Sequence, residues 1–171
     1  ISKTDAVRSQ LAHDMADGGY VIWRLWPEYR AMSDGRLEVF GPEVLPGLQP
    51  RTVARFVLLD AQYRFGTVLV NHRRGSVGQL VGALHADRTW RLTYLDDVSV
   101  VFVRSVEDPL RWPALDLDAP GLFESLGDVR DPGSQQRLSA RTNLLASLGR
   151  PDLALRGWQE ALLRNPDLPG G

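Results

Sequence analysis

The sequence predicts an α/β fold: a mixed sheet with flanking helices that ends in an antiparallel hairpin and is followed by a pair of helices. Three observations lead to this prediction. Apolar, β-branched segments alternate with segments whose apolar residues recur at helical spacing. Two strand-like segments, residues 90–96 and 98–104, are separated by almost nothing, which is typical of a hairpin. Residues 135–168 have the pattern of a helix, a turn and a second helix.

Composition limits the size and the class of the protein. The chain has 171 residues, of which 43% are hydrophobic and 24% charged, as in one globular domain with at most a small appendage. No apolar run approaches the roughly 20 residues that cross a bilayer, so we expect this segment to be soluble. Twenty basic residues balance 21 acidic ones, which does not favour a nucleic-acid partner. Cysteine is absent, and the first residue is Ile1 rather than Met, so we expect a piece of a longer protein without disulfides.

The first part of the chain is predicted to form a helix and then a strand. Residues 4–17 place apolar residues at spacing four, which indicates a helix. Residues 20–26 are aromatic and β-branched, which indicates a strand that ends at Pro27. A short extended piece at 30–33 then leads to a turn at Asp34.

The middle of the chain carries the clearer signals. Residues 51–64 form either a helix or a buried strand, because periodicity does not decide between them. Residues 66–71 indicate a buried strand, and residues 76–86 a helix with one apolar face. The hairpin follows, with Asp96 and Asp97 in its turn.

Proline distribution divides the chain into three parts. Residues 1–104 are expected to form the α/β domain and residues 133–171 a helical hairpin. Between them, residues 105–132 are rich in proline and read as a linker along the surface. Four apolar side chains can hold this linker down: Trp112, Leu115, Leu122 and Phe123.

The C-terminal helical pair resembles a tetratricopeptide (TPR) repeat, a 34-residue helix–turn–helix. The residues that carry the resemblance, and that would pack the pair, are Gly149, Ala154, Trp158, Ala161 and Pro166. The resemblance implies a protein partner. One repeat has no concave groove, so the alternative is a pair that packs on its own α/β domain, with Ala154 and Trp158 at the helix–helix contact.

Two further motifs occur in a specific order. The first contains Gly18, Gly19, Tyr20, Trp23, Pro27 and Asp34-Gly35-Arg36, and the second contains Trp90, Tyr94, Asp96, Asp97, Phe102 and Arg104. Together with the C-terminal repeat, this order resembles the soluble, extracytoplasmic (periplasmic) domain of bacterial multi-pass membrane proteins of the GT-C glycosyltransferase class.

The GT-C resemblance implies that this chain and the catalytic part of the parent membrane protein are separate. In that class the catalytic acid lies in a loop between membrane helices, so we expect this chain itself to have no catalytic residue and no cofactor. The parent protein would be a glycosyltransferase that uses lipid-phosphate sugars. The implied partners of this chain are a lipid-linked sugar or lipid phosphate, or a protein bound by the helical pair.

Five residues are candidates for ligand binding. Asp34 and Arg36, two apart across a glycine, can hold a sugar hydroxyl or a phosphate, or simply form a β-turn. Arg73 and Arg74 follow a predicted strand and precede a helix, where an anion can bind, although a basic surface loop has the same pattern. Tyr20 completes the set from the Gly-Gly-Tyr motif.

Other chemistry finds less support in the sequence. Asp96 and Asp97 can ligate a cation, but adjacent carboxylates in a hairpin turn more often solvate it, and the three histidines lack ligand spacing, so we expect no metal. The stripe of Trp23, Trp26 and Tyr29 can stack on a sugar ring or fill the core.

Overall fold

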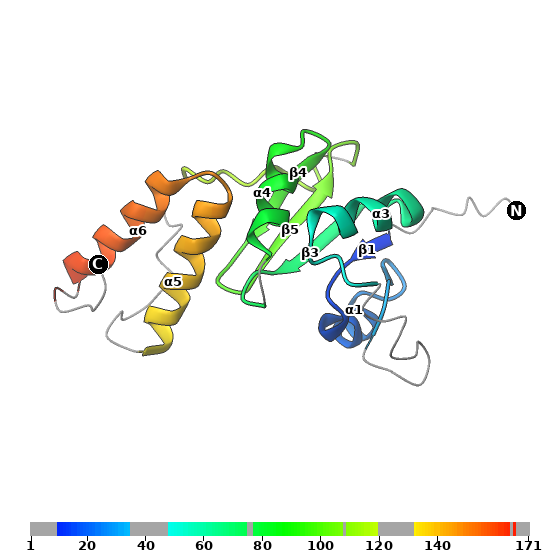
Figure 1. Ribbon diagram of the computed structural model, residues 1–171, viewed down its shortest axis with the longest axis horizontal. Coiled ribbons are helices and arrows are strands. Elements are labelled where there is room, and N and C mark those ends of the chain that lie inside the picture. Colours follow the sequence, from blue (N-terminus) through cyan, green and yellow to red (C-terminus); the bar gives the residue numbers. More distant parts are fainter. Residues whose placement is uncertain are drawn as a thin grey trace, which may run out of the picture.

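A five-stranded mixed sheet forms the centre of the computed structural model, which describes residues 10–34, 48–74, 77–107, 109–119, 132–164 and 166 (Figure 1). The strand order is β2-β1-β3-β5-β4. The strands are β1 (Gln10–Ala12), β2 (Arg30–Ala31), β3 (Thr67–Asn71), β4 (Trp90–Leu95) and β5 (Ser99–Arg104). The helices are the 3-10 turn η1 (Met15–Asp17), α1 (Gly18–Leu25), α3 (Val53–Tyr63), α4 (Gly78–Ala86), α5 (Pro132–Ser147) and α6 (Pro151–Arg164).

The sheet combines a parallel half with an antiparallel half. β1 runs parallel to both β2 and β3, and β5 pairs antiparallel with β3 and with β4. The chain leaves β1 toward β2 on one side and returns across it to β3 on the other side. The carboxyl ends of β1 and β3 therefore form a topological switch point, where ligands of α/β proteins commonly bind.

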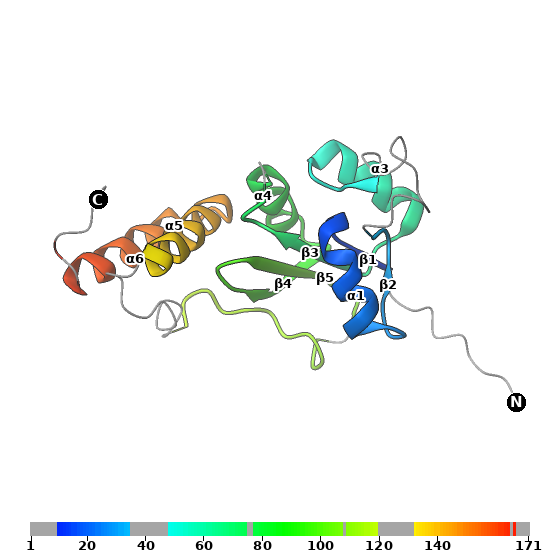
Figure 2. The same ribbon diagram turned by 90° about the horizontal axis from the view of Figure 1, so that it is seen from below.

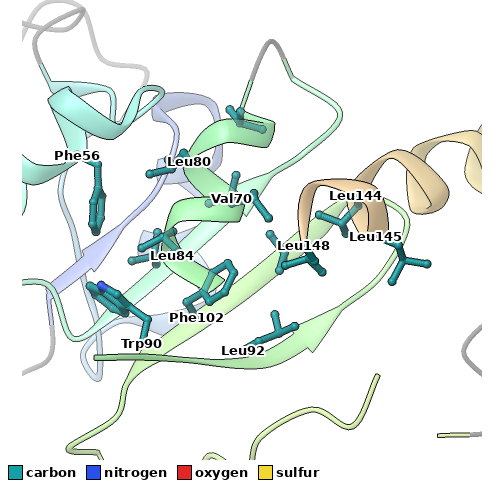
Figure 3. Packing of buried hydrophobic residues seen from close by; sticks show 14 of the residues in the cluster. Phe56, Val70, Leu80, Leu84, Trp90, Leu92, Phe102, Leu144, Leu145 and Leu148 are labelled. Carbon is teal, nitrogen blue, oxygen red and sulfur yellow. The ribbon is translucent and has the colours of Figure 1, made fainter. Parts of the chain in front are cut away.

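The two faces of the sheet are covered unequally. Helices α3 and α4 lie on one face, whereas α1 and the segment 109–119 lie on the other (Figure 2). The main core is on the α3/α4 side, where Phe56, Leu80, Leu84, Trp90 and Phe102 pack together (Figure 3). Across the described ranges, no helix has both the length and the apolar character that a bilayer span requires.

The fold class predicted from the sequence is confirmed, and so are several of its elements. The strand predicted at 66–71 is β3, the helix predicted at 76–86 is α4, and the hairpin is β4 and β5. The alternative left open at 51–64 is settled as helix α3. Its N-terminus is capped by Thr52, whose hydroxyl accepts a hydrogen bond from the Arg55 amide at 3.2 Å.

Two predictions near the N-terminus are wrong. Within the described part of residues 4–17, Gln10–Ala12 form the strand β1 and Met15–Asp17 a 3-10 turn instead of a helix. The predicted strand at 20–26 is helix α1. Both errors have one cause, because β1 gains its hydrogen bonds from β2 and β3, and α1 supplies the crossover that parallel pairing requires.

The turn between α5 and α6 explains the glycine at its centre. Gly149 has a φ of +73°, a conformation that side chains with a Cβ rarely adopt. Its amide donates to the Ala146 carbonyl at 3.0 Å, and the Arg150 amide donates to the Leu145 carbonyl at 2.9 Å. This pair of bonds is a Schellman motif, which ends α5 and lets α6 begin two residues later.

The helical pair shares the core of the α/β unit. Leu144, Leu145 and Leu148 of α5 belong to the same buried cluster as the sheet residues (Figure 3). The half-buried Ala154 and Trp158 pack against that cluster. The assignment of the pair as a TPR repeat stays a prediction.

Two glycines of α4 lie directly against α5. A Cβ on Gly82 would stand 2.7 Å from the Ser147 backbone oxygen, and a Cβ on Gly78 would stand 2.7 Å from the Ser147 hydroxyl. Beyond this contact, Arg141 of α5 pairs with Asp97 of the β4–β5 turn at 2.8 Å. The close approach of the two helices therefore depends on glycine at position 82, where the neighbour is backbone.

We expect Gly82→Ala to destabilise the protein and Gly78→Ala to be nearly neutral. At position 82 the new methyl group displaces the α5 backbone, at a cost of about 1–3 kcal/mol, whereas at position 78 the Ser147 hydroxyl rotates away. Urea unfolding followed by circular dichroism measures both. Equal midpoints for the two variants would contradict the proposed close contact.

Candidate functional site

The four candidate ligand residues that the structure describes do not come together in one site. Tyr20 lies on α1, on the side of the sheet opposite α3 and α4. Asp34 is buried just after β2, and Arg74 lies in an ion-pair network after β3. Arg73 lines a different hollow, between α4 and α5. Arg36 lies outside the described residues.

The switch point between β1 and β3 is closed by ion pairs. Arg51 donates from Nε and Nη2 to one Asp14 oxygen, at 2.9 and 2.8 Å. Arg74 reaches Asp17 at 3.2 Å and the other Asp14 oxygen at 4.0 Å. The cavity left at this edge measures about 20 Å³, which is room for one water.

The Asp14 carboxyl is held in its charged form. Partial burial by itself raises its pKa, but hydrogen bonds from the Ala16 amide and the Arg51 guanidinium more than offset this, so the pKa lies below its ordinary value. The charge of Arg74 is thereby neutralised by its own chain. The anion site predicted around Arg73 and Arg74 is not assembled among the described residues.

His13 lies fully buried beside this network. Its Nε2 accepts the Met32 amide at 3.0 Å, so Nδ1 carries the proton and donates to the Asp14 carbonyl at 2.8 Å. Burial lowers the pKa of the imidazole and outweighs the attraction of nearby carboxylates, which raises it. A neutral imidazole therefore links the segment after β1 to the segment after β2.

We expect the free energy of unfolding to decrease as the pH falls below about 6.5. The pKa of His13 is lower in the folded than in the unfolded protein, so its contribution is complete above the unfolded pKa of 6.5 and is lost as pH falls toward the folded value. The slope from one such group is at most about 1.4 kcal/mol per pH unit. His13→Gln should flatten urea-derived stability plotted between pH 5 and 7, whereas the more exposed His85→Gln should leave most of the slope. An unchanged slope in His13→Gln would contradict this assignment.

An apolar groove of about 470 Å³ opens on the opposite face of the sheet. It is bounded by strands β1, β3, β4 and β5 below, by α1 on one side and by the segment 111–113 on the other. Its lining residues are Leu11, Tyr20, Leu25, Tyr29, Thr67, Leu69, Thr93, Tyr94, Val101, Arg111, Trp112 and Pro113. The groove combines aromatic rings with a few hydroxyl groups, which is the usual chemistry of a binding pocket.

A β-bulge brings two residues of β4 to the groove. Leu92 pairs with Phe102, but Tyr94 pairs with Val101, so Thr93 is the extra residue. Both Thr93 and Tyr94 therefore line the groove instead of alternating between faces.

Two of the groove tyrosines, Tyr29 and Tyr94, stay neutral at physiological pH. Burial raises the pKa of Tyr29, and the hydrogen bond from Tyr94 to Asp96, at 2.8 Å, together with burial raises the pKa of Tyr94. Arg111 is the one cation among the lining residues that the structure describes, and it faces Glu28 at 3.6 Å at the exposed rim. The groove thus presents apolar walls, neutral hydroxyls and a positive charge at its mouth.

Arg91 holds the outer wall of the groove in place. Its guanidinium donates to the Ser105 and Trp112 carbonyls at 2.9 Å each, and to the Glu107 carbonyl at 3.5 Å. Further along, the Leu115 amide donates to the Leu92 carbonyl at 2.8 Å. The predicted linker is therefore fastened along β4 in its described part, whereas Leu122 and Phe123 lie outside the described residues.

We expect Arg91→Met to loosen this wall while leaving the rest of the fold intact. Methionine keeps the apolar stem but removes charge-assisted hydrogen bonds, each worth about 1.5–3 kcal/mol. Hydrogen exchange should show faster exchange of amides in 105–107 and 109–115, with α3 and α4 unchanged. Arg88→Met, in the turn before β4, serves as the control. Equal exchange in Arg91→Met and the unsubstituted protein would show that the wall is held by other contacts.

The two hairpin aspartates have structural roles. Asp96 accepts hydrogen bonds from the Val98 and Ser99 amides at 2.8 and 2.6 Å, which offset the effect of burial and keep the pKa of its carboxyl low. Asp97 pairs with Arg141 and, at 3.7 Å, with Arg137. Among the described residues, no group of three or more potential ligands could hold a metal ion.

The sequence reasoning missed most of the groove. It named Tyr20 as a candidate ligand residue and Tyr29 as part of an aromatic stripe. It gave Tyr94 a place in the second motif and Thr93 no role, and it treated Trp112 only as a packing residue. The usable signal was the alternation in β3 and β5, which leaves Leu69 and Val101 on the face away from α3 and α4. The bulge and the contacts of Arg91 have no local signature.

Comparisons of the chain with models of protein families, with curated proteins and with solved structures find no match.

Proposed function

We propose that the chain is a non-catalytic accessory domain of a membrane-bound, glycosyltransferase-like protein, and that its apolar groove positions a lipid-phosphate ligand such as a lipid-linked sugar. The observation that carries the proposal is the groove itself, with apolar walls along the sheet and Arg111 at its mouth. The resemblance of the Gly18–Arg36 and Trp90–Arg104 motifs to GT-C-class proteins supports the extracytoplasmic setting.

The groove chemistry suits a ligand with an apolar chain and an anionic head. Leu11, Leu69 and Val101 form a floor without charge, on which an isoprenoid chain can lie. Arg111 can pair with a phosphate at the rim, where its side chain is 62% exposed and its present partner Glu28 is 71% exposed. Because a surface ion pair of this kind contributes little free energy, Arg111 can exchange Glu28 for a phosphate at little cost.

The side chains that line the groove favour binding without catalysis. Among the groove residues described, the titratable side chains are three tyrosines and one arginine, with no carboxylate or imidazole. Acid–base chemistry on a sugar usually needs two carboxylates placed across the reacting bond. Tyr20, Tyr29 and Tyr94 instead offer ring faces and hydroxyls, which bind without reacting.

We expect farnesyl phosphate, used below its micellar concentration, to bind saturably with a dissociation constant on the order of tens of micromolar, from ~0.3 kcal/mol per non-hydrogen atom. Leu69→Asn places an amide in the apolar floor and should weaken binding about tenfold. Leu58→Asn, on the exposed side of α3, is the matched control and should bind normally. Isothermal titration calorimetry measures all three proteins.

A further variant tests the contribution of the ligand's phosphate head separately from that of its isoprenoid chain. Arg111→Gln should weaken farnesyl phosphate but not farnesol. Absence of saturable binding, or equal losses in Leu69→Asn and Leu58→Asn, would contradict the proposed site.

A protein-interaction role for the helical pair is the alternative proposal. One observation favours it, a hollow of about 400 Å³ between α4 and α5 with polar residues such as Arg73, Gln136 and Asn143 along it. Against it, Leu144, Leu145 and Leu148 of α5 are buried with the core of the α/β unit. The face that a repeat would offer to a partner is thus partly used within the chain.

A further inference from the structure

Helix α1 and Trp26, the residue that follows it, present a row of large apolar side chains to solvent. Trp23 is 78% exposed, Tyr20 and Trp26 are each 58% exposed, and Ile22 is 39% exposed. We call these four residues the aromatic ridge. Leu110, near Arg111 on the other side of the groove mouth, is 93% exposed. So much exposed aromatic surface on one short element marks an interaction site.

The ridge is held outward by the packing of the same helix. Gly18 and Val21 are buried, and a Cβ on Gly18 would collide with the Ser33 carbonyl, so this face of α1 cannot turn away from the sheet. Tyr20 and Trp23 lie one turn apart, with ring centroids separated by 6.1 Å. The ridge therefore projects from a fixed helix, and its most exposed ring, Trp23, contributes little to the core.

The exposed charges described in the segments that carry the ridge and the groove mouth are predominantly positive. The exposed charged residues in 18–31 and 110–112 are Arg24, Glu28, Arg30 and Arg111. Glu28 faces Arg111 at 3.6 Å, which leaves Arg24 and Arg30 as net positive charge beside the ridge. Exposed Trp and Tyr next to arginines are the composition of segments that lie in the interface of an anionic bilayer.

The ridge is also continuous with the groove. Tyr20 belongs to both, because its ring contacts Trp23 and lines the groove. If the domain rests on a lipid surface through the ridge, the groove mouth lies at the level of the headgroups. An amphiphilic ligand can then enter the groove with its apolar chain first.

We propose that the aromatic ridge docks the domain on the surface of an anionic lipid bilayer, with Trp23 and Trp26 in the interface and Arg24 and Arg30 on lipid phosphates. This docking lies at the surface and involves no membrane span. It goes beyond the proposed function, because it requires neither a lipid-linked sugar nor an occupied groove.

Vesicle co-sedimentation with the 171-residue chain tests the proposal. We expect binding to vesicles of phosphatidylcholine and phosphatidylglycerol in a 3:1 ratio, with a shift of tryptophan emission to shorter wavelength. Trp23→Gln should weaken binding on the order of tenfold, and Trp23→Phe should retain most of it. Leu163→Gln, which removes an 85% exposed leucine from α6, is the matched control and should bind normally.

Charge variants test the role of the arginines. Arg24→Gln and Arg30→Gln should each weaken binding to the anionic vesicles roughly fivefold and leave the weaker binding to pure phosphatidylcholine unchanged. Circular dichroism checks that each variant is folded, which is expected because the substituted side chains are exposed.

Several results would overturn the proposal. The first three are absence of binding to the anionic vesicles, binding by Trp23→Gln as strong as that of the unsubstituted protein, and a loss in Leu163→Gln as large as that in Trp23→Gln. Another is a dimer of the unsubstituted protein in vesicle-free buffer that Trp23→Gln dissociates. Such a dimer would make the ridge a contact between copies of the chain. The vesicles contain no isoprenoid, and Leu69→Asn should bind them normally. Failure of the groove and failure of the ridge are therefore separate results, and loss of vesicle binding in Leu69→Asn would assign lipid contact to the groove instead.

Discussion

The unequal covering of the two sheet faces is the constraint on which the rest of the structure depends. On one face α3 and α4 bury Phe56, Leu59 and Leu80 against β3 and β5, and this layer forms a continuous core. Among the described residues, the other face carries only the eight-residue helix α1 and the extended segment 109–119. A groove remains there because no described helix lies over apolar strand residues such as Leu69 and Val101.

Arginine side chains hold many of the short elements in place. Arg104 stacks on Trp90 with its guanidinium carbon 4.0 Å from the ring centre, and it pairs with Asp60 of α3. Arg91 fastens the wall of the groove, and Arg141 joins α5 to the hairpin turn. A planar guanidinium can serve several acceptors at once, so one side chain joins segments that lie far apart in the sequence. Breaking such a buried pair costs more than forming it contributes, because the remaining charge is left without its partner.

The switch point, where the topology favours ligand binding, and the apolar groove lie at different places on the sheet. At the switch point of the parallel strands, Asp14, Arg51 and Arg74 satisfy one another and leave about 20 Å³. The open face, in contrast, has aromatic rings and apolar side chains around a much larger volume. The groove and the aromatic ridge meet at Tyr20, so ligand binding and surface docking would act from the same side of the domain.

The sequence by itself determined the elements whose signals are local. β3 and α4 have continuous apolar or helical patterns, the hairpin has strands joined by a turn that Asp96 caps, and Gly149 marks the turn between α5 and α6. Only the tertiary structure decided the remainder. β1 is a strand because two neighbours pair with it, and residues 20–25 are helical because a parallel crossover needs a helix there, although their aromatic and β-branched composition favours a strand. The groove belongs to this second class, because it is assembled from four strands, one helix and a distant segment whose proximity depends on burial and on arginine contacts that no local pattern encodes.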